Sequence, residues 1–155
     1  MKKHHQKYET GFSLLELMIV ISVIALLISI SGYAWQIIVR RGNEAAAVTL
    51  IKKINTAQAY FASKHKGRFA ESLSVLAKAN LLEKSFNDAI PVVDGYRFRL
   101  KTDDSPSRYF SLNADPEIGG GIRATGSSHY FLDSASHSIT VTEDGRPANA
   151  DDPSL

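Results

Sequence analysis

A run of 23 residues without a formal charge, Leu17 to Val39, most restricts what this chain can fold into. At about 1.5 Å per residue, a helix of this length would extend roughly 34 Å, more than the ~30 Å hydrocarbon core of a bilayer. Helices buried in soluble proteins rarely run this long without a charge. We therefore expect residues 12–39 to form a helix that crosses a membrane.

The basic start of the chain also suits a secretory signal peptide, with Ser29-Ile30-Ser31 as a small-x-small cleavage site. However, the apolar run continues past this site to Val39, whereas the apolar region of a signal peptide has about 7–15 residues. Lysines precede the run and Arg40 and Arg41 follow it, so the distribution of positive charge does not fix the orientation.

One carboxylate, Glu16, stands at the head of the apolar run. The segment Ser13–Glu16 fits the S-x-x-E capping box, in which the Ser hydroxyl and the Glu carboxylate each accept a backbone N–H of the first helical turn. Phe12 and Leu17 would form the accompanying hydrophobic staple. A capping box explains why a helix starts here, but it does not explain the basic segment before it.

The leader MKKHHQKYETG ends in Gly11 and is followed by Phe12, by Glu16 at the fifth position counted from Phe12, and by the apolar run. In this combination, over residues 2–61, the chain resembles the type IV prepilin and pseudopilin family. The resemblance implies that a membrane-embedded prepilin peptidase cuts after Gly11 and that the new N-terminal Phe12 is N-methylated. It also implies that the apolar helix remains as anchor and later as filament core, with Glu16 as the partner of the Phe12 amine.

The chain departs from the family pattern in two ways. Many type IV pilins carry a helix-bending proline, but this helix has none before Pro91. The C-terminal disulfide common in true pilins is impossible, because the chain has no cysteine. Removal of the leader would also change the count of basic and acidic residues from 18 and 16 to 15 and 15, so the mature subunit would carry no formal net side-chain charge.

The sequence predicts three segments: a leader over residues 1–11, the assembly helix over 12–39, and a head over 40–155. Helical spacing continues over 40–66 as an amphipathic half of the same helix, with apolar positions Ala47, Leu50, Ile51, Ile54, Ala57, Tyr60 and Phe61. A short helix is expected over 72–82, a loop over 86–94, and strands over 96–101, 109–113, 129–132 and 138–142, before a polar tail. The fold class is therefore α+β, with the long helix packed on a small antiparallel sheet of three to four strands.

The histidines and the acidic residues give only weak indications of a catalytic or metal-binding site. His129 and His137 lie near Asp133 and Ser134, but no motif of a hydrolase or of a metalloprotease surrounds them, and we expect no enzyme activity. The major pseudopilin of type II secretion holds calcium in its C-terminal loops. Asp133, Glu143 and Asp144 are the corresponding candidates here, although their spacing is not that of a calcium-binding loop, and no cofactor is expected.

The predicted function is that of a structural subunit, major or minor, of a type IV pilus. It would sit in the bacterial inner membrane with its N-terminus in the cytoplasm and its head in the periplasm, and later in a pilus at the cell surface. Its partners would be prepilin peptidase, inner-membrane lipid, other pilin subunits and the assembly machinery. The net charge of +2 does not indicate nucleic-acid binding.

Two alternatives remain open at this stage. A pseudopilin of a type II secretion system would form a short periplasmic pseudopilus. A signal-anchored periplasmic binding module would never polymerise.

The mature chain is predicted to begin at Phe12 with a methylated α-amine. Peptide mass analysis of membrane-extracted protein, from a host with an active prepilin peptidase, checks this. Replacement of Gly11 by a bulky residue should block processing, because a small residue must fit the peptidase at the cut. An uncut terminus at Met1 or Lys2 in the wild-type chain would contradict the assignment.

Overall fold

The computed structural model describes residues 11–103 and 107–155, and the side chains of residues 30–34 also lie outside the description. Contacts divide the chain into two compact units, one ending at Trp35 and the other, here called the head, comprising Gln36–Leu155. Helix α1 (Leu14–Lys64) contributes to both. The two units are described separately.

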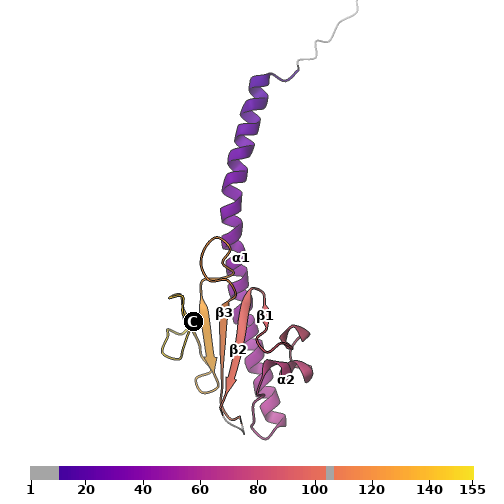
Figure 1. Cartoon of the computed structure of the whole chain (residues 1–155), viewed down its shortest axis with the longest axis vertical. Helices are drawn as coiled ribbons and strands as arrows, with labels where there is room; N and C mark the ends of the chain where they lie inside the picture. Colours follow the sequence, from indigo (N-terminus) through magenta and orange to yellow (C-terminus); the bar gives the residue numbers. More distant parts are fainter. Residues whose placement is uncertain (1–10, 104–106) are drawn as a thin grey trace, which may run out of the picture. The chain divides into compact units, whose positions relative to one another are not determined.

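The head combines the second part of α1 with a five-stranded antiparallel sheet in the order β1-β2-β3-β4-β5 (Figure 1). The remaining elements are α2 (Leu73–Lys78), the 3₁₀ turn η1 (Lys84–Phe86), β1 (Val92–Val93), β2 (Tyr96–Thr102), β3 (Phe110–Pro116), β4 (His129–Asp133) and β5 (Ile139–Thr142). The predicted α+β class is confirmed.

The sheet has one strand more than the three to four expected. Residues 86–94 were predicted to be loop, but Val92 and Val93 pair with β2. Asp94 and Gly95 between these strands both have positive φ, 49° and 73°, as a tight hairpin turn of the Asp-Gly type requires. The strand was missed because two residues are too few to show an alternating pattern.

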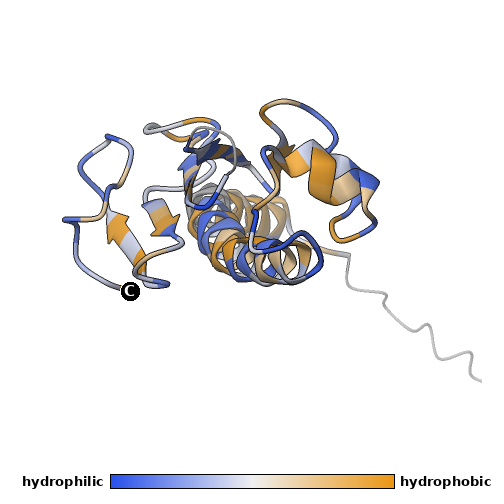
Figure 2. Cartoon of the chain, turned by 90° about the horizontal axis from the view of Figure 1, so that it is seen from below, coloured by the Kyte–Doolittle hydropathy of each residue, from blue (hydrophilic) through white to orange (hydrophobic). Residues whose placement is uncertain are grey.

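The core lies between α1 and the sheet because every second strand residue is apolar. Helix positions Ala47, Ile51 and Ile54 are at most 1% exposed. From the sheet they meet the buried side chains Tyr96, Phe98, Phe110, Leu112, Ala114, Tyr130 and Leu132. In Figure 2 the strands and α2 carry apolar residues, whereas the connecting loops are mostly hydrophilic. Full burial of each large side chain stabilises the fold by about 1.5–3 kcal/mol.

One of the residues expected in this core is not there. Tyr60 is 53% exposed, with the Lys64 ammonium 5.7 Å from its ring centroid. Phe61 is only partly buried and stacks on the His65 ring at a centroid distance of 3.8 Å. Phe61 packs against the edge of the core and Ala62 is buried, so of the predicted apolar positions Tyr60 is the one that points away from the core.

The end of α1 is fixed by a buried polar side chain and by two residues whose backbone is in the left-handed conformation. Gln58 is fully buried, and its amide both donates to the Ala70 carbonyl at 3.0 Å and accepts the Ala70 N–H at 2.8 Å. Lys66 and Gly67 have positive φ, and the Gly67 N–H donates to the Ala62 carbonyl at 2.9 Å. The helix thus stops shortly before the predicted Lys66–Gly67, in the manner of a Schellman motif.

The second helix is shorter than the predicted range 72–82. Ser72 is its N-cap, as its hydroxyl accepts the Val75 N–H at 3.4 Å. After Lys78 the chain turns through Asn80, whose φ is 56°. A left-handed residue ends the helix while the apolar pattern continues to Leu82, which is why the sequence overestimates its length.

The loop between β3 and β4 is tied to α1 by side chains one turn apart. Arg40 Nε donates to the Ala124 carbonyl at 3.2 Å, and Asn43 Nδ2 donates to the Thr125 carbonyl at 2.8 Å. Glu44 accepts both the backbone N–H and the hydroxyl of Ser127, at 2.9 and 2.8 Å. These bonds hold a loop that would otherwise be free to move, because it is rich in glycine.

The isolated head, Gln36–Leu155, is predicted to fold as a soluble monomer, because its core and the hydrogen bonds described above lie within it. Circular dichroism and urea unfolding should show one cooperative transition with a stability of about 5–15 kcal/mol. A fragment without cooperative unfolding would contradict the division of the chain at residues 35 and 36.

Candidate functional site

The N-terminal end of α1 carries one half of the expected capping box. Helix α1 begins at Leu14, and the Glu16 carboxylate accepts the Ser13 N–H at 3.2 Å. Among the hydrogen bonds of the described residues, the reciprocal bond to the Ser13 hydroxyl is not formed. A negative charge in the first turn also interacts favourably with the helix dipole.

The expected processing position is open to solvent. Phe12 is 86% exposed, and nothing lies within 4 Å of the point where a Cβ of Gly11 would be. Both residues precede the first helical residue, Leu14, so the Gly11–Phe12 peptide bond lies in non-helical chain. The leader itself, residues 1–10, lies outside the described residues.

The first part of α1, residues 14–29, exposes apolar side chains on all sides. Its two serines satisfy their hydroxyls internally, because Ser22 donates to the Met18 carbonyl and Ser29 to the Ala25 carbonyl, each at 2.7 Å. Together with Phe12 just before the helix, the large apolar residues of this part that are about half exposed or more are Leu14, Leu15, Leu17, Met18, Ile19, Val20, Ile21, Val23, Ile24, Leu26, Leu27 and Ile28. An exposed apolar surface of this extent marks an interaction site with lipid or with protein.

In the part of the chain that the structure describes, no helix meets both the length and the apolarity needed to cross a membrane. The expected membrane helix over residues 12–39 includes residues 30–34, whose side chains lie outside the description.

The three calcium candidates do not come together. Asp133 is the last residue of β4, and Ser128, which directly precedes that strand, donates its hydroxyl to the Glu143 carboxylate at 3.4 Å. Five residues of extended chain correspond to roughly 17 Å. Asp144 neighbours Glu143, so the hairpin register separates Asp133 from the other two acids. No group of three or more acidic, His or Cys side chains among the described residues could hold a metal ion.

Asp133 instead closes the turn between β4 and β5. One of its carboxylate oxygens accepts the N–H groups of Ala135 and Ser136, at 3.0 and 2.7 Å, and the Ser136 hydroxyl at 2.8 Å. The other accepts the Tyr109 hydroxyl at 3.3 Å. Burial alone would raise the pKa of Asp133, but these hydrogen bonds outweigh it and lower that pKa below its usual value.

The structure does not bring His129 and His137 together with Asp133 and Ser134 as a catalytic triad. His129 Nδ1 lies 2.7 Å from Asp115 Oδ1, not against Asp133. The Ser134 hydroxyl accepts the Phe110 N–H at 3.1 Å, and the His137 N–H donates to the Asp133 carbonyl at 3.3 Å. These groups therefore stabilise strand ends and a turn.

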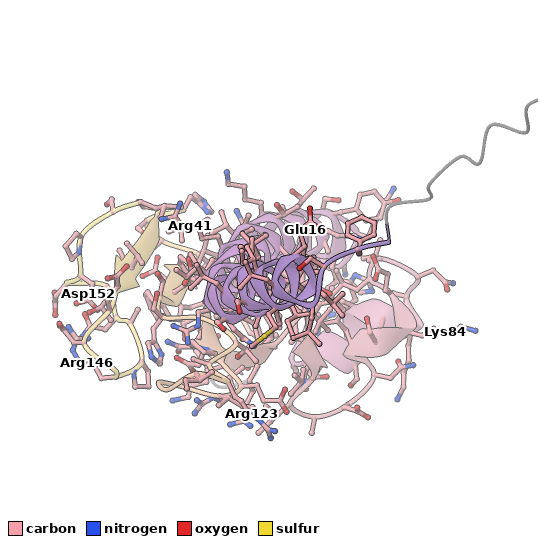
Figure 3. The ribbon with its side chains drawn as sticks, turned by 90° about the horizontal axis from the view of Figure 1, so that it is seen from above. Glu16, Arg41, Lys84, Arg123, Arg146 and Asp152 are labelled. Carbon is pink, nitrogen blue, oxygen red and sulfur yellow. The ribbon has the colours of Figure 1, made fainter. Side chains whose placement is uncertain are left out.

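The acids of the C-terminal segment pair with an arginine that the sequence did not single out. The Arg146 guanidinium donates to both carboxylate oxygens of Asp152, and the two residues lie next to each other in Figure 3. Arg146 is also 3.6 Å from Asp144. The hydrogen bond from Arg146 lowers the pKa of Asp152. A positive side chain thus neutralises two of the acids in this segment.

The expected polar tail, residues 146–155, is held against the sheet. The Asn113 amide donates to the Ala148 carbonyl at 2.8 Å, and the Val141 N–H donates to the Pro153 carbonyl at 2.9 Å. Ala148 is 3% exposed. On the side of the tail these contacts are made by backbone carbonyls, which is why hydropathy did not reveal them.

Residues 6–32 match the family described as the prokaryotic N-terminal methylation motif. The chain therefore carries the signature of type IV prepilins and pseudopilins, and the resemblance found in the sequence is confirmed. This signature marks structural proteins that prepilin peptidase processes and that assemble with other pilins. No curated protein and no solved structure matches the chain.

Replacement of Asp133 by Asn is predicted to cost about 1–3 kcal/mol of stability at neutral pH, as it disturbs hydrogen bonds to a buried charged group. A folded-state pKa below the unfolded value of about 3.9 stabilises the fold above that pH. This contribution is lost as the pH falls from about 4 through the folded-state pKa. Urea unfolding of the head between pH 6 and pH 2.5 should therefore show a weaker pH dependence in the variant than in the wild type.

Asp88→Asn is the matched control, because the exposed Asp88 side chain makes no hydrogen bond within the described part of the chain. An equal change of the pH dependence in both variants would contradict the role given to the Asp133 turn.

Proposed function

We propose that this chain is a structural subunit of a type IV pilus, processed by prepilin peptidase and polymerised through its N-terminal helix. The observation that carries the proposal is the methylation motif at residues 6–32, which coincides with an exposed apolar helix headed by Glu16. The head, a separate compact unit with its own core, supports a division between an assembling helix and a folded domain.

Processing would change the environment of Glu16. In the uncut chain its carboxylate accepts the Ser13 N–H. Hydrolysis of the Gly11–Phe12 amide releases a free amine on Phe12, which stays cationic after methylation. Phe12 and Glu16 are spaced i, i+4, so the amine can pair with Glu16 of its own helix or of a neighbouring copy. In an apolar surrounding such a pair stabilises the assembly only if both charges are present.

The apolar surface of residues 14–29 would have two partners in succession. Before assembly we place it in the lipid of the bacterial inner membrane, with the N-terminus in the cytoplasm and the head in the periplasm. During assembly the same side chains would pack against copies of the helix. The internally bonded hydroxyls of Ser22 and Ser29 suit both surroundings, because no polar group of these side chains is left to water.

The motif is shared with pseudopilins of type II secretion systems, so the location of the filaments decides between the two. A pilus subunit appears in the fraction sheared from the cell surface, whereas a pseudopilin remains in the periplasm. A signal-anchored binding module gives no filament in either fraction and keeps its leader or loses it after Ser31.

Glu16→Ala and Glu16→Gln should both insert and be processed, yet should lower the filament yield at least tenfold relative to total membrane protein. Gln retains a carbonyl that can accept the Ser13 N–H in a capping box but removes the charge. The pair of variants therefore separates capping from charge pairing. Immunoblots of sheared and periplasmic fractions give the yield.

Glu117→Gln, an exposed acid of the head outside the motif, is the control and should assemble like the wild type. Normal filaments from Glu16→Gln would reduce Glu16 to a capping residue and would contradict the proposed pairing with the Phe12 amine.

A further inference from the structure

A cleft of about 580 Å³ lies in the head, outside the proposed assembly helix. Its polar floor comes from neighbouring strands: Arg97 and Arg99 of β2, Asp115 of β3 and His129 of β4. These residues alternate with the core residues of the same strands, so they lie on the face of the sheet away from the core. The loop between β3 and β4 and the turn after β5 supply further lining residues.

Asp115 is already fully engaged within this floor. One carboxylate oxygen accepts from Arg99 Nη2 at 2.7 Å, and the other lies 2.7 Å from His129 Nδ1. The sheet register places Arg97, not Arg99, directly opposite Asp115. The ion pair is therefore diagonal, and it leaves the directly opposite arginine without this carboxylate.

The N–H groups of the Arg97 guanidinium are consequently available as hydrogen-bond donors. It is half-buried and makes no hydrogen bond or ion pair among the residues that the structure describes. Its neighbour Arg99 also holds a buried Nε without a partner in that set. A partly desolvated guanidinium carries five N–H donors in a planar fork that fits a carboxylate. Two such groups at one cleft indicate an acceptor supplied from outside the chain.

The charge of the cleft limits what that acceptor can be. With histidine counted as neutral, the lining contains the cations Arg40, Arg97 and Arg99 and the anions Asp115 and Glu143, which leaves one positive charge in excess. One carboxylate balances this charge, whereas a phosphate dianion would leave a negative one. The volume exceeds that of a carboxylate group alone and falls in the range of small-ligand sites.

We propose that this cleft binds a small monocarboxylate with an uncharged, hydrogen-bonding body, and that the Arg97 guanidinium holds the carboxylate. The body faces the backbone groups of the glycine-rich loop and the hydroxyl of Ser127, which line the same cleft. The Ser127 hydroxyl donates its own proton to Glu44, so toward the ligand its oxygen acts as an acceptor. The site is complete within one head, so it does not depend on filament formation.

Isothermal titration of the full chain in a neutral detergent, at 0.1 M salt, tests the proposal. The probes are glucuronate, N-acetylglycine, their uncharged counterparts glucose and N-acetylglycinamide, and inorganic phosphate. At least one carboxylate probe should bind saturably with one site per chain, and its uncharged counterpart should not. Glucuronate and N-acetylglycine distinguish a sugar acid from the carboxyl end of a peptide.

Arg97→Gln should weaken this binding at least tenfold, and Arg97→Lys should retain part of it, because the charge remains while the planar fork is lost. Lys101→Gln is the matched control: it removes the same charge from the same strand, at an exposed position outside the cleft. Circular dichroism of each variant confirms its fold.

Three results would overturn the proposal: no saturable binding of either carboxylate, tighter binding of phosphate than of both, or equal losses in Arg97→Gln and Lys101→Gln.

Discussion

The exposed apolar surface of residues 14–29 is the constraint on which the rest of the structure depends. Its large apolar side chains are about half exposed or more, and the hydroxyls of Ser22 and Ser29 both donate to helix carbonyls. At about 25 cal/mol per Å² of apolar area, removal of this surface from water is strongly favourable. Lipid and a second copy of the helix both remove it, and Glu16 is the one formally charged residue between Phe12 and Val39 that such a partner must accommodate.

The head is stabilised differently, because its fold does not depend on burial of that apolar surface. Its core joins the second part of α1 to one face of the sheet, and the opposite face carries the charged side chains of Arg97, Arg99 and Asp115. Side-chain bonds then fix its long connections: Arg40, Asn43 and Glu44 hold the loop between β3 and β4. Arg146 and Asp152 hold the C-terminal segment. These links allow a domain with no disulfide to keep its loops in place, and they leave a charged cleft between them.

The sequence predicted the elements that follow from the periodicity of apolar residues. It did not predict the contacts between segments that lie far apart in the chain. The long helix, four of the strands and the short helix follow from apolar spacing, and the motif around Gly11, Phe12 and Glu16 is local enough to be found by eye. The strand Val92–Val93, the diagonal pair of Arg99 with Asp115 and the docked tail rest on contacts between distant segments. The calcium candidates failed to converge for the same reason, since strand register cannot be read from composition.

Cysteine cross-linking of the N-terminal helix in whole cells tests the central claim most directly, because the wild-type chain has no cysteine and hence no background. Single cysteines at Val20 or Ile24 would be oxidised in cells that carry filaments, and the products separated by size. Packing of the helix against copies of itself predicts dimers from at least one of these positions, enriched in the filament fraction. Monomers alone at both positions, in cells with abundant filaments, would contradict it.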